Sequence, residues 1–290
     1  MKPIYKTPRS REAVLELYDR QLSRIGCAFS DIYVDTTYGQ THIVDTGNPH
    51  GQPLLVFHGG NSTTAYNLLA CRFLLNDFHV YAVDSIGHPG KSDQVSLSPW
   101  NYSYGKWASE VIDRLGFDKM RCFAGSFGGG ILAKLMCVAP QKIIRSVLIV
   151  PAGIGNAFPL SSAKMMIPLI RYLRTGDDRY VTEAALYMAI TKDVLDPDTL
   201  DTVKSSFMHV KTKVGMPSNV SGRRMRRCMA PTLVMAGELD CLFPAKKVLK
   251  RAGKILRNHT LYELKGRGHM HRLTDGEINR ILAFLNGPEA

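Results

Sequence analysis

Two periods of hydrophobicity run through this chain, one of about two residues and one of about 3.6, and they separate predicted strands from predicted helices. Thr7 and Pro8 have the form of a helix N-cap and first helical residue, and apolar residues then recur at helical spacing over Val14–Ile25. Apolar and polar residues alternate in Ala28–Thr37 and again in Gln40–Thr46, with a short turn between the two runs. These runs predict a β-hairpin.

From residue 53 the pattern changes to short, continuous apolar runs that alternate with helical stripes. The predicted strands are Pro53–Phe57, His79–Val83, Met120–Ala124, Ser146–Val150, Thr232–Ala236 and Thr260–Leu264. The predicted helices are Tyr66–Leu75, Tyr104–Leu115, a segment that ends near Val138, one that begins at Pro244, and Asp275–Leu285. Strands that are apolar throughout and alternate with helices predict an α/β fold, a mostly parallel sheet flanked by helices on both faces. The hairpin adds antiparallel strands at one edge.

This alternation is interrupted between residues 154 and 228. The segment holds three amphipathic helical pieces, Ala163–Leu173, Tyr180–Ile190 and Asp198–Val210, and no strong strand pattern. We therefore expect a helical cap over residues 154–228, inserted in a core that comprises residues 1–153 and 229–290.

The first cap helix is apolar on more than one face, which is more than a simple surface helix needs. Methionine side chains adapt to irregular ligands, and Met166 and Leu169 are the candidate substrate-binding residues. If they line the pocket, replacing either by Trp should shorten the preferred acyl chain. The alternative is that they only pack the cap onto the core.

Composition narrows the functional classes. The chain has 290 residues, 45% hydrophobic and 21% charged, as in an ordinary globular protein. Its net charge of +12 is dispersed except for the run at residues 223–227, and no nucleic-acid module accompanies it, so we expect a basic solvated surface and no nucleic-acid partner. The sequence shows no secretory signal and no membrane span. Its six scattered cysteines indicate neither a disulfide framework nor a zinc site, and we expect a reducing, cytoplasmic location.

The stretch from Met120 to Ala133 reads as a strand, a sharp turn and a helix, with Ser126 at the tip of the turn. Small residues on both sides of the serine permit the strained backbone that exposes its hydroxyl, the arrangement called a nucleophile elbow. The usual pattern is Gly-x-Ser-x-Gly, and here Ala124 takes the first glycine position.

Two nucleotide-binding motifs are also partly matched in the sequence, and both fail. Residues 128–133 formally fit the dinucleotide pattern G-x-G-x-x-A, but the next predicted strand ends without the acidic residue that the motif requires. The Gly-Lys-Ser at residues 90–92 suggests a phosphate loop, but Ser85 stands where that loop needs its first glycine.

A serine nucleophile needs a base and an acid, and both are expected on loops after the carboxyl ends of strands. The candidate base is His269, in a glycine-rich loop after the last strand, with His271 as its competitor. The candidate acid is Asp240, after the strand Thr232–Ala236, with Glu238 as its rival.

The oxyanion of an acyl-transfer intermediate needs two backbone donors. In an elbow, one donor is the N–H of the residue after the nucleophile, here Phe127. The other should come from the loop after Phe57, where Gly60 is the first candidate and Asn61 the second.

These residues together resemble the α/β-hydrolase superfamily over nearly the whole chain, most closely its capped esterase and peptidase-like members. The resemblance rests on the motifs His58-Gly59-Gly60, Asp84 with the Gly87–Ser92 turn, Ala124-Gly-Ser126-Phe-Gly-Gly, Gly237-Glu-Leu-Asp240 and Gly268-His269. It implies that Ser126, Asp240 and His269 form a catalytic triad. A serine at the elbow also makes the dehalogenases and epoxide hydrolases of this fold unlikely relatives, because those enzymes need a carboxylate there.

We therefore expect a serine hydrolase that cleaves a small-molecule carboxylic ester through an acyl-enzyme, without a metal or organic cofactor. One alternative is an aminopeptidase or amidase, because His-Gly-Gly resembles the start of the proline iminopeptidase motif. Asn61 replaces the proline of that motif, and Asp177, Asp178 or Glu183 would have to bind the substrate ammonium group. The other alternative is a non-catalytic receptor on the same fold. The sequence does not specify the acyl group, the alcohol or the oligomeric state.

Overall fold

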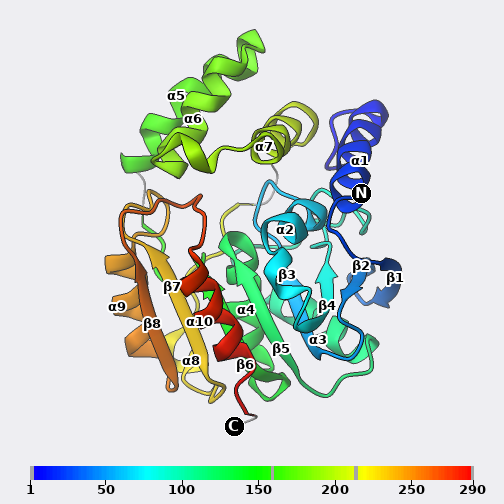
Figure 1. The fold of residues 1–290 in the computed structure, drawn as a ribbon, viewed down its shortest axis with the longest axis vertical. Coiled ribbons are helices and arrows are strands. Elements are labelled where there is room, and N and C mark those ends of the chain that lie inside the picture. Colours follow the sequence, from blue (N-terminus) through cyan, green and yellow to red (C-terminus); the bar gives the residue numbers. More distant parts are fainter. Residues whose placement is uncertain (1–2, 158–159, 212–214, 289–290) are drawn as a thin grey trace.

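An eight-stranded sheet forms the centre of the structure (Figure 1), a computed structural model that describes residues 3–157, 160–211 and 215–288. The strands are β1 (Phe29–Thr36), β2 (Gly39–Gly47), β3 (Gln52–Phe57), β4 (Phe78–Val83), β5 (Met120–Gly125), β6 (Ile143–Ile149), β7 (Thr232–Gly237) and β8 (His259–Leu264). Across the sheet they follow the order β1-β2-β4-β3-β5-β6-β7-β8. β2 pairs antiparallel with β1 and β4, and the remaining pairs are parallel. The predicted α/β fold with an antiparallel hairpin at one edge is confirmed.

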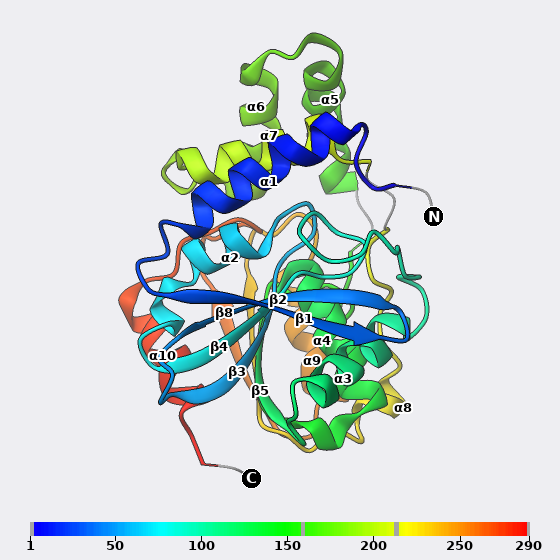
Figure 2. The same ribbon diagram turned by 90° about the vertical axis from the view of Figure 1, so that its right-hand side faces the viewer.

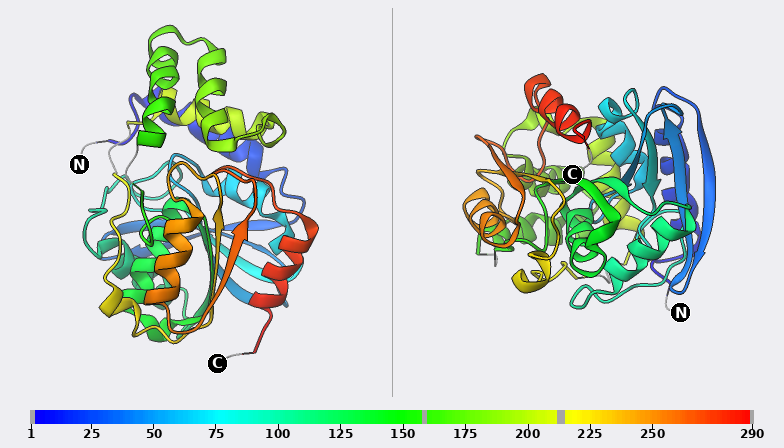
Figure 3. Two further views of the ribbon diagram at one scale, coloured as in Figure 1. Left: turned by 90° about the vertical axis from the view of Figure 1, so that its left-hand side faces the viewer. Right: turned by 90° about the horizontal axis from the view of Figure 1, so that it is seen from below.

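Helices cover both faces of this sheet (Figures 2 and 3). The helices in the described residues are α1 (Pro8–Leu22), α2 (Thr64–Ala70), α3 (Ser103–Arg114), α4 (Ser126–Val138), α5 (Leu160–Thr175), α6 (Asp178–Ala189), α7 (Pro197–His209), α8 (Gly222–Met225), α9 (Ala245–Ile255) and α10 (Asp275–Leu285), with 3₁₀ turns η1 (Arg72–Leu74), η2 (Pro140–Lys142) and η3 (Lys192–Val194). α3, α4 and α9 bury apolar side chains in one cluster. α2, α10 and the end of α1 contribute to a second cluster.

The strand β3 shows why the apolar runs of the sequence are continuous. Leu55 and Phe57 belong to the cluster that contains α3 and α4, whereas Leu54 and Val56 belong to the cluster that contains α2 and α10. Successive side chains of a strand point to opposite faces, so a strand covered on both sides is apolar at every position.

The three helices α5, α6 and α7 lie together beyond one end of the sheet, next to α1 (Figure 1). α5 and α6 pack on each other as a helical hairpin with its own small apolar cluster. On the return to the sheet, Val220, Met225 and Cys228 already lie in the main core cluster. The helical unit above the sheet is therefore shorter than residues 154–228, because the last part of that range supplies core side chains.

The predicted helix Tyr66–Leu75 is interrupted. α2 ends at Ala70, and Cys71 has the non-helical torsions φ −115° and ψ 28° before the 3₁₀ turn η1. Nothing in the apolar spacing marks this break, because Leu74 and Leu75 continue to face the core.

Two expectations drawn from the composition concern the cysteines and membrane-spanning helices. All six cysteines lie in described parts of the chain and are free thiols. Among residues 3–157, 160–211 and 215–288, no helix has the length and apolar character needed to cross a membrane.

Candidate active site

Ser126 lies at the junction of β5 and α4, where the strand turns directly into the helix. Its φ of +50° is in the left-handed region, which costs a non-glycine residue about 1–3 kcal/mol. The neighbouring glycine allows this turn: a β-carbon on Gly128 would lie 2.5 Å from the carbonyl oxygen of Phe57. Small residues are therefore required around Ser126 because the elbow touches the end of β3.

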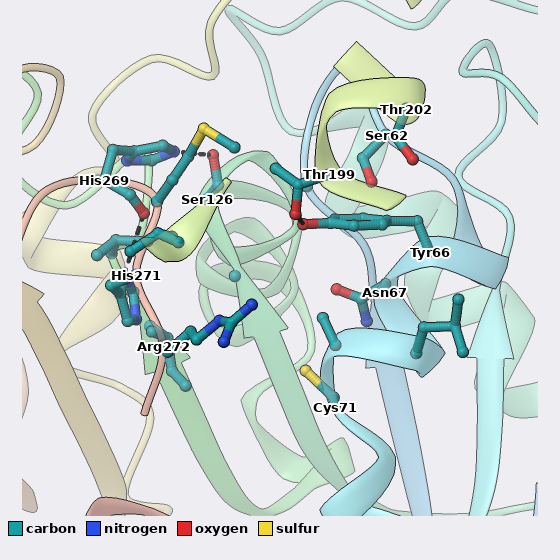
Figure 4. A pocket seen from close by; sticks show the side chains of 18 of the residues that line it. Ser62, Tyr66, Asn67, Cys71, Ser126, Thr199, Thr202, His269, His271 and Arg272 are labelled. Atoms are coloured by element: carbon teal, nitrogen blue, oxygen red, sulfur yellow. Dashed lines mark hydrogen bonds between the residues drawn. The ribbon is translucent and has the colours of Figure 1, made fainter. Parts of the chain in front are cut away.

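Three side chains from three distant segments form one hydrogen-bonded chain at this point (Figure 4). Ser126 Oγ lies 2.9 Å from Nε2 of His269, and Nδ1 of His269 lies 2.9 Å from Oδ2 of Asp240. His269 follows β8 and Asp240 follows β7, so neighbouring parallel strands place them at the same edge of the sheet.

Asp240 is held as a carboxylate. Its side chain is buried, and Oδ1 accepts hydrogen bonds from the backbone N–H groups of Leu242 (2.7 Å) and Phe243 (2.9 Å). Burial by itself would raise the pKa of this carboxyl, but the charge and hydrogen bond of His269 and the two N–H donors outweigh burial and lower it. A carboxylate only accepts hydrogen bonds, so the Nδ1 atom of His269 carries the proton and Nε2 presents a lone pair to the serine hydroxyl.

The loop after β3 packs directly against the elbow. A β-carbon on Gly59 would lie 3.5 Å from Cβ of Ser126, and one on Gly60 would lie 3.2 Å from Cβ of Phe127. Asn61, the next residue, has φ +51°. Phe127 is the second residue of α4, so its N–H is among those that have no partner within the helix. The backbone of Gly60 thus lies next to Phe127, the residue that follows the serine.

Two buried histidines contact this loop and the elbow. His58 holds it to the next strand end, because its Nε2 atom accepts the N–H of Ser85 at 3.1 Å while Nδ1 lies 2.7 Å from the carbonyl of Gly59. The ring centroids of His88 and Phe127 lie 4.3 Å apart. Burial lowers the pKa of His58 and lowers that of His88 to about 3, so both rings are neutral near pH 7.

A pocket of about 610 Å³ opens above Ser126. Its apolar walls come from α2 and η1, from η3 and α7, and from α10 and the loop that leads to it. These walls include Leu69, Phe73, Val194, Val203, Phe207, Leu273 and Ile278. Polar side chains also face the pocket, and Figure 4 shows Ser62, Asn67, Cys71 and Arg272 around it. In the described parts of the chain, no group of three His, Cys, Asp or Glu side chains is placed to bind a metal ion.

Hydrogen bonds join α6 and α7 to core segments that also line this pocket. The hydroxyl of Tyr66 lies 2.8 Å from Oγ1 of Thr199, which joins α2 to α7. The N–H of Met270, next to His269, donates to the carbonyl of Met188 at the end of α6, at 3.0 Å. The helical unit therefore contacts the loop that carries His269.

The structure separates the other sequence candidates from this centre. His271 lines the pocket, but its Nδ1 atom lies 3.2 Å from the carbonyl of His269 and it is not part of the hydrogen-bonded chain to Ser126. Glu238 accepts the N–H of Gly266 at 2.8 Å at an exposed position.

Met166 and Leu169 are not among the residues that line the pocket. Met166 is 45% exposed on α5, and Leu169 is buried between α5 and α6. The side chains of this unit that line the pocket belong instead to α6, η3 and α7. They are Met188, Val194, Asp196, Thr199, Thr202, Val203 and Phe207. The sequence predicted a helix over Asp198–Val210, but its pattern does not show which helix of the unit lies above the serine.

Comparisons with known proteins agree with this fold. Residues 54–280 match the model of the Alpha/beta hydrolase family. The carboxylesterase YbfK of Bacillus subtilis is 26% identical over 94% of this chain and 93% of its own length. The uncharacterized carboxylesterase nap of the same organism is 23% identical over 93% of this chain and 91% of its own. The crystal structure of naproxen esterase (carboxylesterase NP) from Bacillus subtilis superposes with a TM-score of 0.81 at 21% identity, covering 97% of this chain and 100% of that one.

Proposed function

Because this chain belongs to the Alpha/beta hydrolase family, we propose that it is a serine carboxylesterase that works through an acyl-enzyme intermediate. The observation that carries this proposal is the continuous chain from Ser126 through His269 to Asp240, with 2.9 Å at each link, at the base of a largely apolar pocket. The chain is a hydrolase, and its similarity to two curated carboxylesterases favours an ester as the substrate.

In the acylation step, Ser126 Oγ attacks the carbonyl carbon of the ester while Nε2 of His269 takes the hydroxyl proton. The carbonyl electron pair moves to oxygen, and the N–H groups of Phe127 and Gly60 donate to this oxyanion. The tetrahedral intermediate then collapses, the bond to the alcohol oxygen breaks, and His269 returns the proton to the departing alcohol.

Deacylation reverses these roles with water as the nucleophile. His269 takes a proton from water as its oxygen attacks the acyl carbon, and the proton then passes to Oγ of Ser126 as the acid leaves. Asp240 holds the ring in the required tautomer and stabilises the imidazolium in both steps. Its lowered pKa suits this role because the carboxylate stays charged throughout.

We also propose that α5, α6 and α7 act as a cap that determines which acyl or alcohol groups fit. The support is that α7 covers the pocket with Val203 and Phe207 and is tied to the core by the Tyr66–Thr199 hydrogen bond. In this division the core comprises residues 1–153 and 229–290 together with the return segment that contains Val220 and Met225.

A panel of p-nitrophenyl esters and aminoacyl p-nitroanilides tests this function. We expect turnover of the esters and negligible cleavage of the anilides, because the pocket walls are largely apolar. Preferred cleavage of the anilides would instead support an aminopeptidase. Binding of esters without turnover would support a receptor and contradict the proposal.

A further inference from the structure

Helix α5 is apolar around more than half of its circumference, and only part of this surface is packed. Its inner side buries Leu169 and Tyr172 against Val181 and Ala184 of α6. This contact accounts for the hairpin of α5 and α6.

The outer face of α5 consists of Met166, Ile167, Ile170 and Leu173, with exposed fractions of 45%, 58%, 44% and 51%. The spacing of these residues places them on one side of a helix with about 3.6 residues per turn. Single exposed apolar residues are common on soluble proteins, but a contiguous group on one helix marks an interaction surface.

Positive charge borders this outer face. At about 100° per residue, Lys164 and Arg171 lie along the edge next to Ile167, and Arg174 lies between Ile167 and Ile170 at the C-terminal end of the face. All three cations are exposed. The sequence of α5 contains no Asp or Glu, so the helix carries three cations and no anion.

The position of α5 makes the outer face accessible. Figures 1 and 2 show that α5 lies at the end of the molecule farthest from the C-terminus, beyond the sheet and next to α6. This is the end at which the pocket lies, because α6 and α7 supply part of its lining.

We propose that the outer face of α5 docks on an anionic lipid surface. A helix with an exposed apolar side and a basic edge lies in the plane of a membrane interface, with the apolar side chains among the acyl chains and the cations near the head groups. The net charge of +12 adds a general attraction to the same surface. The inference concerns attachment alone and does not depend on the catalytic proposal.

A second copy of this chain fits the outer face less well. A symmetric contact would place α5 against α5, and three cations of one helix would face those of the other with no carboxylate on either helix. An anionic lipid surface satisfies both the apolar side and the charges.

Sedimentation of the full chain with lipid vesicles tests this proposal. We expect binding to vesicles of phosphatidylcholine mixed with phosphatidylglycerol, weaker binding as salt is raised, and little binding to phosphatidylcholine alone. Absence of binding to the mixed vesicles would overturn the proposal.

Variants of the outer face locate the contact. Ile167→Glu with Leu173→Glu should weaken binding at least about tenfold, and Lys164→Gln with Arg171→Gln and Arg174→Gln should weaken it about 100-fold, since each cation near the surface contributes about a factor of five. Hydrolysis of a short, soluble ester should be unchanged, which shows that the variants fold.

Two controls match these changes elsewhere on the molecule. Met229→Glu introduces a charge at a residue that is 64% exposed, and Lys246→Gln with Lys247→Gln and Lys250→Gln removes three cations from α9. Both controls should retain most of the vesicle binding. Equal loss in the α9 variant would show a general charge effect and overturn the proposal. So would a dimer in analytical ultracentrifugation that dissociates when the outer face is changed.

Discussion

Asp240 uses both oxygens of its carboxylate, and this distinguishes it from the nearby Glu238. One oxygen accepts two backbone N–H groups, and the other faces Nδ1 of His269. The Glu238 side chain is exposed and accepts the N–H of Gly266. The two acids therefore differ in burial and in partner, although they are only two positions apart in the sequence.

Replacing the two acids by amides should separate their roles. Asp240→Asn should reduce kcat by up to about 10⁴-fold, because the amide favours the wrong tautomer of His269. Glu238→Gln keeps a hydrogen-bond acceptor for Gly266 and should change kcat far less. Steady-state kinetics on one p-nitrophenyl ester measures both, and the reverse ranking would refute the assignment of Asp240.

Strand and helix periods predicted most elements to within a few residues, because each element buries one or two defined faces. β6 begins earlier than predicted, at Ile143. The charged Arg145 interrupts the apolar run in the sequence, but it lies inside the strand and its guanidinium donates to the carbonyl of Pro288. The break at Cys71 and the placement of α7 over the pocket escaped prediction. At Cys71 the apolar spacing continues across the break. The placement of α7 depends on contacts between distant segments, such as Tyr66 with Thr199, which local periodicity does not encode.

In the candidate site, too, local sequence predicts some features and contacts between distant segments determine others. Ser126, Asp240 and His269 were identified because each follows a predicted strand in a short loop with small residues. Their hydrogen-bonded arrangement is a property of the structure, and their catalytic roles stay predictions. The apolar character of α5 favours Met166 and Leu169 as pocket residues, but Met166 is exposed, Leu169 packs on α6, and neither lines the pocket.

At the scale of elements, α7 should set the size of the acceptable substrate. Val203→Trp, which fills the pocket from α7, should lower kcat/KM for long acyl esters by roughly tenfold or more relative to an acetate ester. Met166→Trp is the matched control on α5 and should leave the ratio unchanged. A uniform loss on every ester, with a lower Tm, would mean that Val203 is only structural.

A cluster of polar and charged side chains around the buried His42 holds α1 against the edge of the sheet. His42 lies between two carboxylates, with Nδ1 2.8 Å from Asp84 and Nε2 2.7 Å from Asp31. The hydroxyl of Tyr18, on α1, donates to Asp84 at 3.3 Å, and Lys91 lies 3.6 Å from Asp31. The cluster therefore joins α1, β1, β2 and the loop after β4.

The charges of this cluster depend on one another. Burial by itself lowers the pKa of His42, but the hydrogen bonds and charges of Asp84 and Asp31 outweigh burial and raise it. Burial raises the pKa of Asp84, and the hydrogen bond and charge of His42 reverse that effect and lower it. A charged imidazole between two carboxylates is thus the favoured form.

This arrangement predicts a pH dependence of stability. Because the pKa of His42 is raised on folding, its stabilising contribution is fully present below its ordinary value of 6.5 and is lost as pH rises through the folded value. The difference in the free energy of unfolding between the natural chain and His42→Gln, measured with urea, should therefore shrink as pH rises above 6.5 and through the raised pKa of His42. The exposed His50→Gln variant is the control. A difference that is constant with pH would contradict a charged His42.

The central claim is that Ser126 is the nucleophile, and covalent labelling tests it most directly. A fluorophosphonate reacts preferentially with an activated serine, and digestion followed by mass spectrometry locates the adduct. We expect one adduct on Ser126, loss of ester hydrolysis in proportion to labelling, and neither labelling nor hydrolysis above roughly 10⁻⁴ to 10⁻⁶ of the natural rate in Ser126→Ala. An adduct on another residue, or ester hydrolysis that persists in Ser126→Ala, would contradict the account.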